Sequence, residues 1–241
     1  MRNVLLLVIS YTYGLSVIGT GRILQVKLGK DVGFTRKIIH LFAGYSAFVV
    51  FWFNPDWAWL AIIIGCSFTF LLYLARSRGP LTPVFETMAR DEERSRGSLA
   101  GPLYYATSLT ILTTTCAFPA TVPFYWIPAS CLSMMFIGDG IAPIVGKRFG
   151  HHPYGTRGRT VEGSIGVLFG SYAGYCITIL LAVFTSNTQI LFIPQPVVFL
   201  LGVPLSIENA IIEGLTPSGY DNVTCPFITS GTMFFLVVLL S

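Results

Sequence analysis

The stretch FYWIPASCLSMMFIGDGIAPIVGKRFG, Phe124 to Gly150, decides the fold of this chain. Residues 124–145 carry a single charged side chain, Asp139. They are long enough to cross a bilayer as a helix, because roughly 20 apolar residues span the hydrocarbon core. A basic pair, Lys147 and Arg148, follows directly. The stretch therefore predicts a transmembrane helix that carries one carboxylate close to a basic end.

The composition of the whole chain agrees with this prediction. Of its 241 residues, 53% are hydrophobic and only 11% are charged, whereas an ordinary soluble domain has about 25% charged residues. We therefore predict an all-α, polytopic transmembrane helix bundle that forms a single domain over residues 1–241. The eight predicted spans cover 3–24, 38–53, 57–74, 98–118, 124–145, 164–184, 190–212 and 227–240.

The basic residues lie in alternate loops. Fourteen of the fifteen Lys and Arg residues fall in the first, third and fifth loops, and only Arg2 lies elsewhere. Since cytoplasmic loops of membrane proteins are enriched in Lys and Arg, the odd loops are predicted to face the cytoplasm and both termini the other side. We expect an integral multi-pass membrane protein whose site faces the cytoplasm. The loops predicted to form it are 22–37, 76–97, 146–163 and 213–226.

Small residues recur every four positions through the opening stretch, at Gly138, Ala142, Gly146 and Gly150. On a helix this spacing forms one small-residue face, which lets a neighbouring helix approach closely. Helix packing is enough to explain this face. It does not explain the carboxylate that lies between two of the glycines.

Asp139 combines two oxygen ligands in one residue. A carboxylate in the middle of a membrane helix costs about 2.5 to 3.5 kcal/mol on insertion scales, so such groups are usually functional. Pro143 has no N–H, which leaves the carbonyl of Asp139 without its helical partner. Carboxylate and carbonyl oxygens are ligands for hard cations such as Mg²⁺. The alternative is that Asp139 pairs with Lys147 or another loop base.

The segment GKRFGHHPYGTRGRTVEGS, Gly146 to Ser164, has the composition of an anion site. It supplies four fixed cations and several glycines, and it ends at the start of the sixth predicted span, where a helix N-terminus offers free N–H groups to a phosphate. The positive-inside rule alone would also produce a basic loop here. Glu162 is either a metal ligand or an acid that favours the first turn of the helix.

Several motifs together resemble the polyprenol kinase family, which comprises dolichol, phytol and farnesol kinases and the CTP-dependent diacylglycerol kinases. The resemblance extends from Arg36 to Pro226, and GPLYY is most similar to phytol and farnesol kinases. Pro143 stands where phytol kinases usually have Asp, so the resemblance supports the reaction and leaves the alcohol open. The motifs that carry it are GDGIAPIVGKRFG, RTVEGS, RKIIH at 36–40, GPLYY at 101–105 and YDNVTCP at 220–226.

The resemblance implies transfer of the γ-phosphate of CTP to the hydroxyl of an isoprenoid alcohol, with Mg²⁺ as cofactor. Partners would be the lipid alcohol, the bilayer and the nucleoside triphosphate, with no nucleic acid; the oligomeric state is not implied. Catalytic candidates are Asp139, Asp221 and Glu162, and metal candidates are Asp139, Asp221 and Asn222. Asp221 would serve either as a metal ligand or as general base. The nucleotide-binding candidates are Gly138, Gly140, Gly146, Lys147, Arg148, Arg157, Arg159, Thr160, Gly163 and Ser164.

Five more polar residues near the predicted cytoplasmic ends of spans are further candidates. Glu208 either joins the same site or pairs with His40, and structural pairing is the expected role of His40. The full set is Arg36, Lys37, His40, Glu208 and Asn209.

Three alternative functions remain open at this point. One is a CTP-dependent diacylglycerol kinase. Another is a CDP-lipid cytidylyltransferase, whose family shares similar Asp/Gly and Thr-x-Glu-Gly motifs but has further C-terminal signatures that are absent here. The last is an ion-coupled transporter, since broken helices and a carboxylate within the membrane also suit ion coupling. Against a transporter, the charged groups gather at one predicted face.

Overall fold

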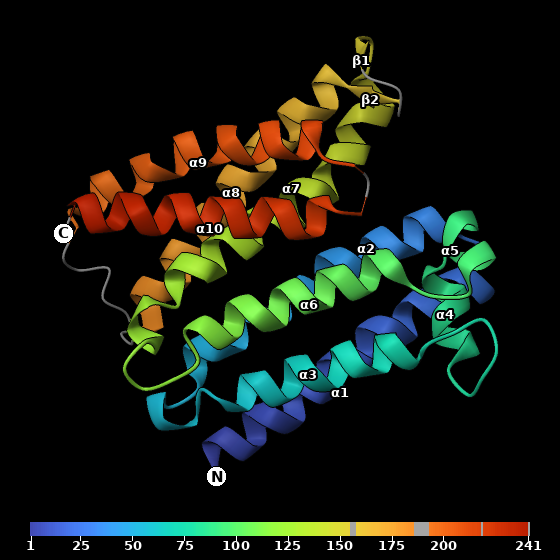
Figure 1. The fold of residues 1–241 in the computed structure, drawn as a ribbon, viewed down its shortest axis with the longest axis horizontal. Helices are drawn as coiled ribbons and strands as arrows, with labels where there is room; N and C mark the ends of the chain where they lie inside the picture. The colour runs from blue at the N-terminus through green and yellow to red at the C-terminus, as the bar shows by residue number, and fades with distance from the viewer. Residues whose placement is uncertain (155–157, 186–192, 218, 241) are drawn as a thin grey trace.

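A computed structural model of the chain describes residues 1–154, 158–185, 193–217 and 219–240. Within these ranges the chain is almost entirely helical, apart from one short β-hairpin (Figure 1). The α-helices are α1 (Arg2–Val26), α2 (Val32–Gly44), α3 (Leu60–Leu74), α4 (Thr82–Met88), α5 (Asp91–Arg96), α6 (Ala100–Thr115), α7 (Trp126–Phe149), α8 (Val161–Thr185), α9 (Gln195–Leu215) and α10 (Asp221–Leu240). The short elements are the 3₁₀ helices η1 (Tyr45–Trp52), η2 (Pro55–Trp57) and η3 (Val122–Phe124) and the strands β1 (Pro153–Tyr154) and β2 (Arg159–Thr160).

The predicted all-α membrane bundle is confirmed. Six helical segments in the described part of the chain are long and apolar enough to cross a membrane, those of α1, α3 and α7 to α10. The predicted spans 38–53 and 98–118 correspond to shorter elements, α2 continued by η1, and the 16-residue α6. Both pack among the longer helices (Figure 1). The number of eight spans stays a prediction.

The helices form two groups that follow the order of the chain. One group contains α1, α2, α3 and α6, and the other contains α7 to α10 (Figure 1). Contacts of α2 with α7 and of α6 with α10 join the groups. Helix α7 lies at the centre, where every residue from Trp126 to Gly138 is buried. A helix that is apolar on all sides is typical of such a central position.

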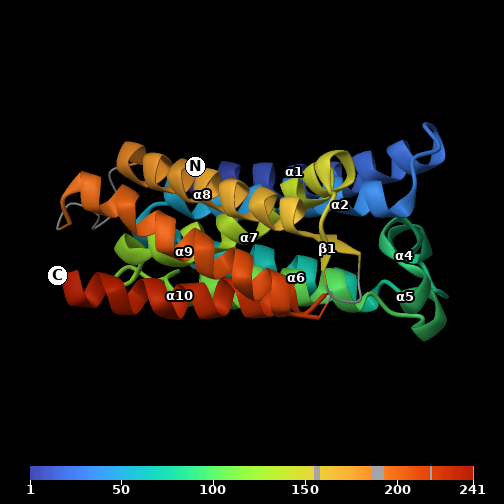
Figure 2. The ribbon, with the colours of Figure 1, turned by 90° about the horizontal axis from the view of Figure 1, so that it is seen from above.

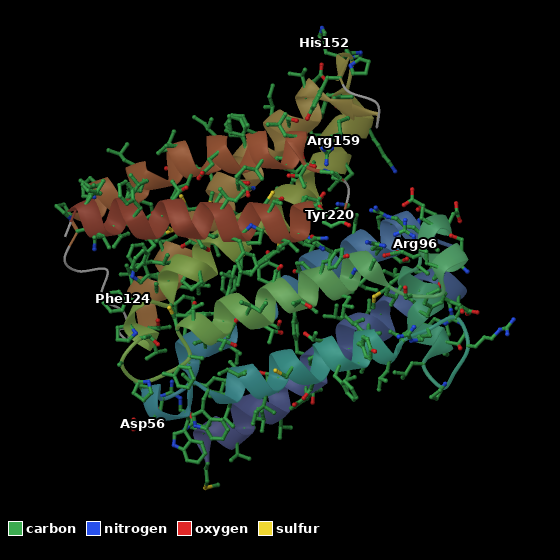
Figure 3. The ribbon with its side chains drawn as sticks, viewed as in Figure 1. Asp56, Arg96, Phe124, His152, Arg159 and Tyr220 are labelled. Atoms are coloured by element: carbon green, nitrogen blue, oxygen red, sulfur yellow. The ribbon has the colours of Figure 1, made fainter. Side chains whose placement is uncertain are left out.

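The two ends of the bundle differ in character. The short helices α4 and α5 lie at one end, and the hairpin lies toward that end, whereas both chain termini lie toward the other (Figures 1 and 2). Arg96 and Asp56 lie toward opposite ends of the molecule (Figure 3). The loops rich in Lys and Arg therefore converge on one end, as alternating spans require. Which side of the membrane this end faces stays a prediction.

The small-residue face of α7 packs against α8, as the sequence predicts. A Cβ atom on Gly170 of α8 would lie 3.0 Å from Cα of Gly138 and 3.2 Å from the carbonyl oxygen of Ile137. A Cβ atom on Gly174 would lie 2.7 Å from the carbonyl oxygen of Ser133. Because these neighbours are backbone atoms, a larger residue cannot be accommodated by rotating a side chain. Glycine is therefore needed on both helices for this close approach.

Replacing Gly174 with leucine is expected to destabilise the folded protein by about 3 kcal/mol, because the added side chain pushes α8 away from α7. The measurement is thermal unfolding of the purified protein in detergent. Gly231→Leu on α10 is the matched control, since a Cβ atom there meets nothing within 4 Å. Equal unfolding temperatures for the two variants would contradict the close contact.

Several helix limits differ from those read from the sequence. Helix α7 continues four residues beyond the predicted span, to Phe149, so that Lys147 and Arg148 belong to its last turn. Helix α10 begins at Asp221, so Asp221 and Asn222 lie in a helical first turn and not in a loop. Hydropathy located the apolar stretches but missed these polar ends, where helix geometry continues past the membrane core.

Candidate functional site

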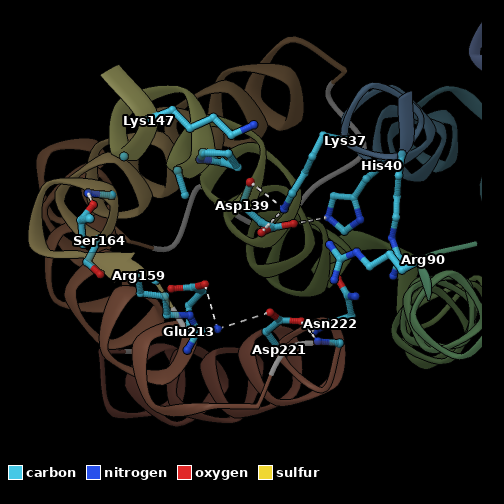
Figure 4. A pocket seen from close by; sticks show the side chains of 18 residues that line it. Lys37, His40, Arg90, Asp139, Lys147, Arg159, Ser164, Glu213, Asp221 and Asn222 are labelled. Carbon is cyan, nitrogen blue, oxygen red and sulfur yellow. Dashed lines mark hydrogen bonds and ion pairs between the residues drawn. The ribbon is translucent and has the colours of Figure 1, made fainter. Parts of the chain in front are cut away.

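A polar pocket opens at the basic end of the bundle, between the two helix groups (Figure 4). Its volume is about 370 Å³. Side chains reach it from α2, α7, α8, α9 and α10, from the hairpin, and from the segment between α4 and α5. The lining residues are Arg36, Lys37, His40, Arg90, Asp139, Ala142, Pro143, Gly146, Lys147, Gly158, Arg159, Thr160, Gly163, Ser164, Glu213, Gly219, Asp221 and Asn222.

Asp139 is held on one wall of the pocket by two residues of α2 (Figure 4). Lys37 donates from Nζ to the carboxylate of Asp139 and, at 3.1 Å, to its backbone carbonyl oxygen. His40 Nε2 lies 3.2 Å from the second carboxylate oxygen. The carbonyl that Pro143 leaves free of a helical hydrogen bond is thus bound by a lysine. Lys37 and His40 are one helical turn apart, so both face Asp139.

Arg159 organises the opposite wall. Its Nη1 donates to the carbonyl oxygens of Gly214 at 2.7 Å and Thr216 at 2.9 Å. Its Nη2 lies 3.2 Å from Glu213 and 3.7 Å from Asp221. One guanidinium therefore contacts the C-terminal end of α9 and two carboxylates of the pocket at the same time. The planar fork of donors on arginine allows this, whereas the single ammonium of a lysine would not.

The start of α10 is also ordered by its own acid. Asp221 Oδ1 accepts hydrogen bonds from the backbone N–H of Gly219 at 3.1 Å and of Asn222 at 2.9 Å. Gly219 has a φ of +94°, a conformation that suits glycine, just before the helix begins. These contacts place Asp221 and Asn222 on the wall of the pocket.

The N-terminus of α8 forms the third side. Thr160 caps this helix, because its Oγ1 accepts a hydrogen bond from the N–H of Gly163 at 3.1 Å. A Cβ atom on Gly146 would lie 3.5 Å from Cα of Gly163, so the end of α7 and the start of α8 lie close together. Ser164 bonds through Oγ to the hydroxyl of Tyr154 at 2.6 Å, which links the helix to the hairpin. The positive end of a 25-residue helix thus faces the pocket.

The pocket carries charges of both signs. Five lining residues are fixed cations, namely Arg36, Lys37, Arg90, Lys147 and Arg159, and three are carboxylates, namely Asp139, Glu213 and Asp221. Cations and a helix N-terminus suit an anion with several charges, such as a polyphosphate. Carboxylates among them suit a metal ion that accompanies such an anion.

Arg36 reaches the pocket from a buried ion pair. It donates to Glu93 on α5 and, at 3.2 Å, to the carbonyl oxygen of Met88. Glu93 in turn accepts a hydrogen bond from the N–H of Gly101 at 2.8 Å. The pair therefore ties α2 to α5 and to the start of α6, and it fixes the mouth of the pocket.

Some of the residues predicted from sequence lie elsewhere. Gly138 and Gly140 do not line the pocket; Gly138 packs against Ser171 and Val167 of α8, and Gly140 packs against Leu41. Arg148 does not line it either. Gly138 and Gly140 thus serve helix packing in this structure. Arg157 lies outside the described residues.

The predicted acids Glu162 and Glu208 also lie outside the pocket lining. Glu162 binds His152, with 2.6 Å between Oε1 and Nδ1, and so joins the hairpin to the first turn of α8. Glu208 accepts a hydrogen bond from Thr232 at 2.7 Å, between α9 and α10, and has no contact with His40. Asn209 is buried beside the pocket and donates to Ser171 Oγ at 2.9 Å.

Two charged lining residues, Glu213 and Arg90, were not among the candidates named from the sequence. The predicted seventh span ended at residue 212, which left Glu213 in the following loop and Glu208 as the acid about one turn inside the span. Helix α9 in fact continues to Leu215. At 100° per residue, the two glutamates lie about 140° apart around the helix, so only one can face the pocket. Both glutamates are visible in the sequence, but the rotation of the helix, which decides which of them faces the pocket, is not.

The adjacent cations Lys147 and Arg148 are expected to differ in function. Lys147 lines the pocket, and among the described residues it makes no hydrogen bond or ion pair, whereas the guanidinium of Arg148 lies over the ring of Phe149. Lys147→Met should weaken the binding of a polyphosphate to the pocket about tenfold, the effect of losing one charged contact. Arg148→Met should leave this affinity within about twofold. Titration of the purified proteins with inorganic tripolyphosphate makes the comparison, and equal effects would contradict the placement.

Comparison with characterised proteins finds four relatives. The phytol kinase of Synechocystis sp. is 26% identical over 219 residues, 89% of this chain and 84% of that protein. A probable chloroplastic phytol kinase 2 of Oryza sativa is 31% identical over 146 residues, 57% of this chain and 45% of that protein. The chloroplastic farnesol kinase of Arabidopsis thaliana is 27% identical over 220 residues, 86% of this chain and 66% of that protein.

These matches differ in extent. The chain spans most of the bacterial relative but less than two thirds of the plant relatives' length. No family model matches the chain, and no solved structure matches it. The relatives that match most of this chain are all named as kinases of an isoprenoid alcohol. The resemblance to polyprenol kinases is therefore confirmed: the chain is a homologue of phytol and farnesol kinases, and these homologues indicate a kinase, that is, a phosphotransferase that acts on an alcohol.

Proposed function

We propose that this protein is a CTP-dependent lipid kinase, which transfers the γ-phosphate of CTP to the hydroxyl of an isoprenoid alcohol of the phytol, farnesol, polyprenol or dolichol type. The observation that carries the proposal is the mixed-charge pocket at the basic end of a membrane bundle, in a homologue of phytol and farnesol kinases. Phosphoryl transfer needs positioning and charge neutralisation more than covalent chemistry. A pocket with five cations and three carboxylates supplies both.

The phosphates of the nucleotide would bind between the end of α7 and the start of α8. Lys147 offers an ammonium there, and the N-terminus of α8 around Thr160 to Ser164 offers backbone N–H groups. Arg36 and Arg159 add charge from opposite walls, although each is already held by a carboxylate. Gly146 lets the end of α7 approach this N-terminus closely, because a Cβ atom on it would lie 3.2 Å from Oγ1 of Thr160.

The donor set on the inner wall fits Mg²⁺. Asp139, Glu213 and Asp221 border a small cavity of about 10 Å³, close to the volume that one bound water needs. Asn209 lines the same cavity, and its buried Oδ1 accepts no hydrogen bond. Among the residues that the structure describes, no three His, Cys, Asp or Glu side chains could hold a metal by themselves. Nucleotide-bound Mg²⁺ commonly takes one or two carboxylates and completes its shell with phosphates and water.

Asp139, Asp221 and Asn222 would hold the ion, with Glu213 nearby. When bound, Mg²⁺ would neutralise charge on the transferred phosphate. A carboxylate of the protein would also accept the proton that the alcohol's hydroxyl group loses. The hydroxyl oxygen of the alcohol forms a bond to the γ-phosphorus, the bond between that phosphorus and the β,γ-bridging oxygen breaks, and CDP leaves. Asp139 or Asp221 accepts the hydroxyl proton, as general base.

We propose further that the pocket faces the cytoplasm, where nucleotides are available. Among the residues that the structure describes, all Lys and Arg residues except Arg2 belong to the loops and helix ends on the pocket's side (Figure 1). The positive-inside rule assigns such an end to the cytoplasm. Cysteine labelling with a membrane-impermeant reagent at Ser77, in the loop before α4, would test this orientation; labelling only after the cells are opened is expected.

The experiment that tests the function measures products. Purified protein in detergent is given γ-labelled CTP, Mg²⁺ and, in separate reactions, phytol, farnesol, a long polyprenol or diacylglycerol. The expected result is label on an isoprenoid alcohol and release of CDP. Label on diacylglycerol would favour a diacylglycerol kinase, and release of pyrophosphate would favour a cytidylyltransferase. Parallel reactions with γ-labelled ATP test the donor, and turnover with no member of the panel would contradict the proposal.

A further inference from the structure

A second cavity, apolar in character, lies directly beside the polar pocket, within the first helix group. Its volume is about 110 Å³. It is formed by α1, α2, η1, α3 and α6, with Met88 of α4, and we call it the apolar crevice. The lining residues are Gly14, Ile18, Ile39, His40, Ala43, Ser46, Ala47, Val49, Val50, Ala61, Ile64, Gly65, Phe68, Leu72, Met88, Tyr105, Ala106, Leu109, Thr110 and Thr113.

The few hydroxyl groups of the crevice are already engaged within the protein. Ser46 donates to the carbonyl oxygen of Ala43, and Thr110 donates to that of Ala106. Thr113 shares a hydrogen bond with the hydroxyl of Tyr125. The crevice therefore offers an occupant almost no polar partner, which suits a hydrocarbon.

His40 lines both cavities and marks their junction. Its ring lies against that of Tyr105, with 4.0 Å between ring centroids, and Tyr105 donates to the carbonyl oxygen of His40 at 2.8 Å. His40 Nε2 is buried and has no hydrogen bond, although it lies 3.2 Å from Asp139 Oδ2. Buried polar nitrogens normally have a hydrogen-bond partner. A hydroxyl at the junction would provide one.

We propose that the apolar crevice holds the isoprenoid tail of the alcohol substrate, with its hydroxyl at His40 Nε2 and facing Asp139. This inference rests on the proposed function and adds the position of the acceptor alcohol. The crevice extends along α6 from Tyr105 to Thr113, about 12 Å at 1.5 Å per residue. A tail in this position enters from the membrane-spanning part of the bundle, while the nucleotide enters from the basic end. The two substrates would meet at Asp139.

Filling the crevice at two depths tests the proposal. Ala106 neighbours Tyr105 near the junction, whereas Ala61 lies at the far end, one helical turn beyond Gly65. Ala106→Leu should lower kcat/KM for farnesol and phytol about 10- to 100-fold, the range for one misplaced group in an apolar pocket. Ala61→Leu should lower kcat/KM more for phytol and farnesol than for the shorter alcohol geraniol. The ratio of kcat/KM for the longer alcohols to that for geraniol should fall about tenfold. Gly231→Leu, on α10, is the matched small-to-large control.

The outcomes separate this inference from the proposed function. If the unsubstituted protein phosphorylates neither these alcohols nor a long polyprenol, the proposed function fails. If it is active, and both crevice variants keep the control's kcat/KM at every chain length, the assignment of the crevice is wrong while the kinase stands. Equal losses for all alcohols with Ala61→Leu would also contradict the expected depth.

A labelling experiment on the unsubstituted protein avoids any question of folding. A farnesol analogue with a photoreactive diazirine on its terminal isoprene unit is added to the active protein and irradiated. Label is expected on peptides of α3 and α6, with protection by excess phytol. Label confined to α9 and α10, or label that phytol does not displace, would overturn the proposal.

Discussion

Asp139→Asn is expected to lower kcat by about 10²- to 10⁴-fold, the range attributed to a positioned acid or base. Asparagine keeps the size of the side chain but removes the negative charge. The change therefore removes both a candidate proton acceptor and a candidate metal ligand from the wall that Lys37 and His40 face. Steady-state kinetics with CTP and the preferred alcohol provides the measurement. Asp56→Asn, toward the opposite end of the bundle, is the matched control (Figure 3).

A second variant distinguishes catalysis from ion pairing. Lys37 is mostly buried, with 25% of its side chain exposed, so Asp139→Asn leaves its charge without a partner. If Asp139 served only to balance this lysine, the double variant Lys37→Met and Asp139→Asn would regain activity. We expect the double variant to stay as inactive as Asp139→Asn. Recovery to within tenfold of the unsubstituted protein would contradict a direct role for Asp139 in the reaction.

Arg159→Met is expected to lower kcat/KM by about 10²-fold and to destabilise the protein by about 3 kcal/mol. The side chain is 19% exposed and contacts Glu213 and Asp221 together with the carbonyl oxygens of Gly214 and Thr216. Its loss leaves two carboxylates without a nearby opposite charge, which is costly in a buried site. It also releases the end of α9. Kinetics and thermal unfolding in detergent measure the two effects.

Arg159→Lys is expected to recover less than a tenth of the lost activity, because an ammonium cannot reach both carboxylates and both carbonyl oxygens at once. Arg78→Met is the control, since Arg78 is an exposed cation outside the pocket at the same end. Full activity of the lysine variant would indicate that positive charge alone suffices at this position. The arrangement around the guanidinium would then have no part in the site.

Short-range rules predicted the contacts of the half of the site that is local in the chain, whereas distant candidates such as Lys37, His40 and Asp221 were named without a predicted contact. Asp139, Lys147, Thr160 and Ser164 lie within one helix end, one hairpin and the next helix start. Glycines, a proline and a capping threonine determine this conformation over short range. Short-range rules therefore located both a carboxylate and a helix N-terminus, and the structure brings them to one pocket.

The other half depends on contacts across the bundle. Lys37 reaches Asp139 from 102 positions earlier in the chain, and the sequence offered Lys147 or any other loop base equally well. Glu213 was missed because hydropathy gives the length of a helix but not its rotation or its polar end. From the sequence, Glu162 could be either a metal ligand or an acid of the first helical turn. In the structure its carboxylate contacts His152, beside the hairpin.

The sequence by itself determined that this chain is a helical membrane protein, where its apolar helices run, and which motif carries the candidate carboxylate. The physical reason is that the bilayer requires each span to satisfy its own backbone, so composition and length suffice. Only the tertiary structure decided which cations and acids share the pocket and that His40 joins it to an apolar crevice. These features depend on how the helices are rotated and packed against one another. The shapes of the side chains determine this packing, and the periodicity of the sequence does not reveal it.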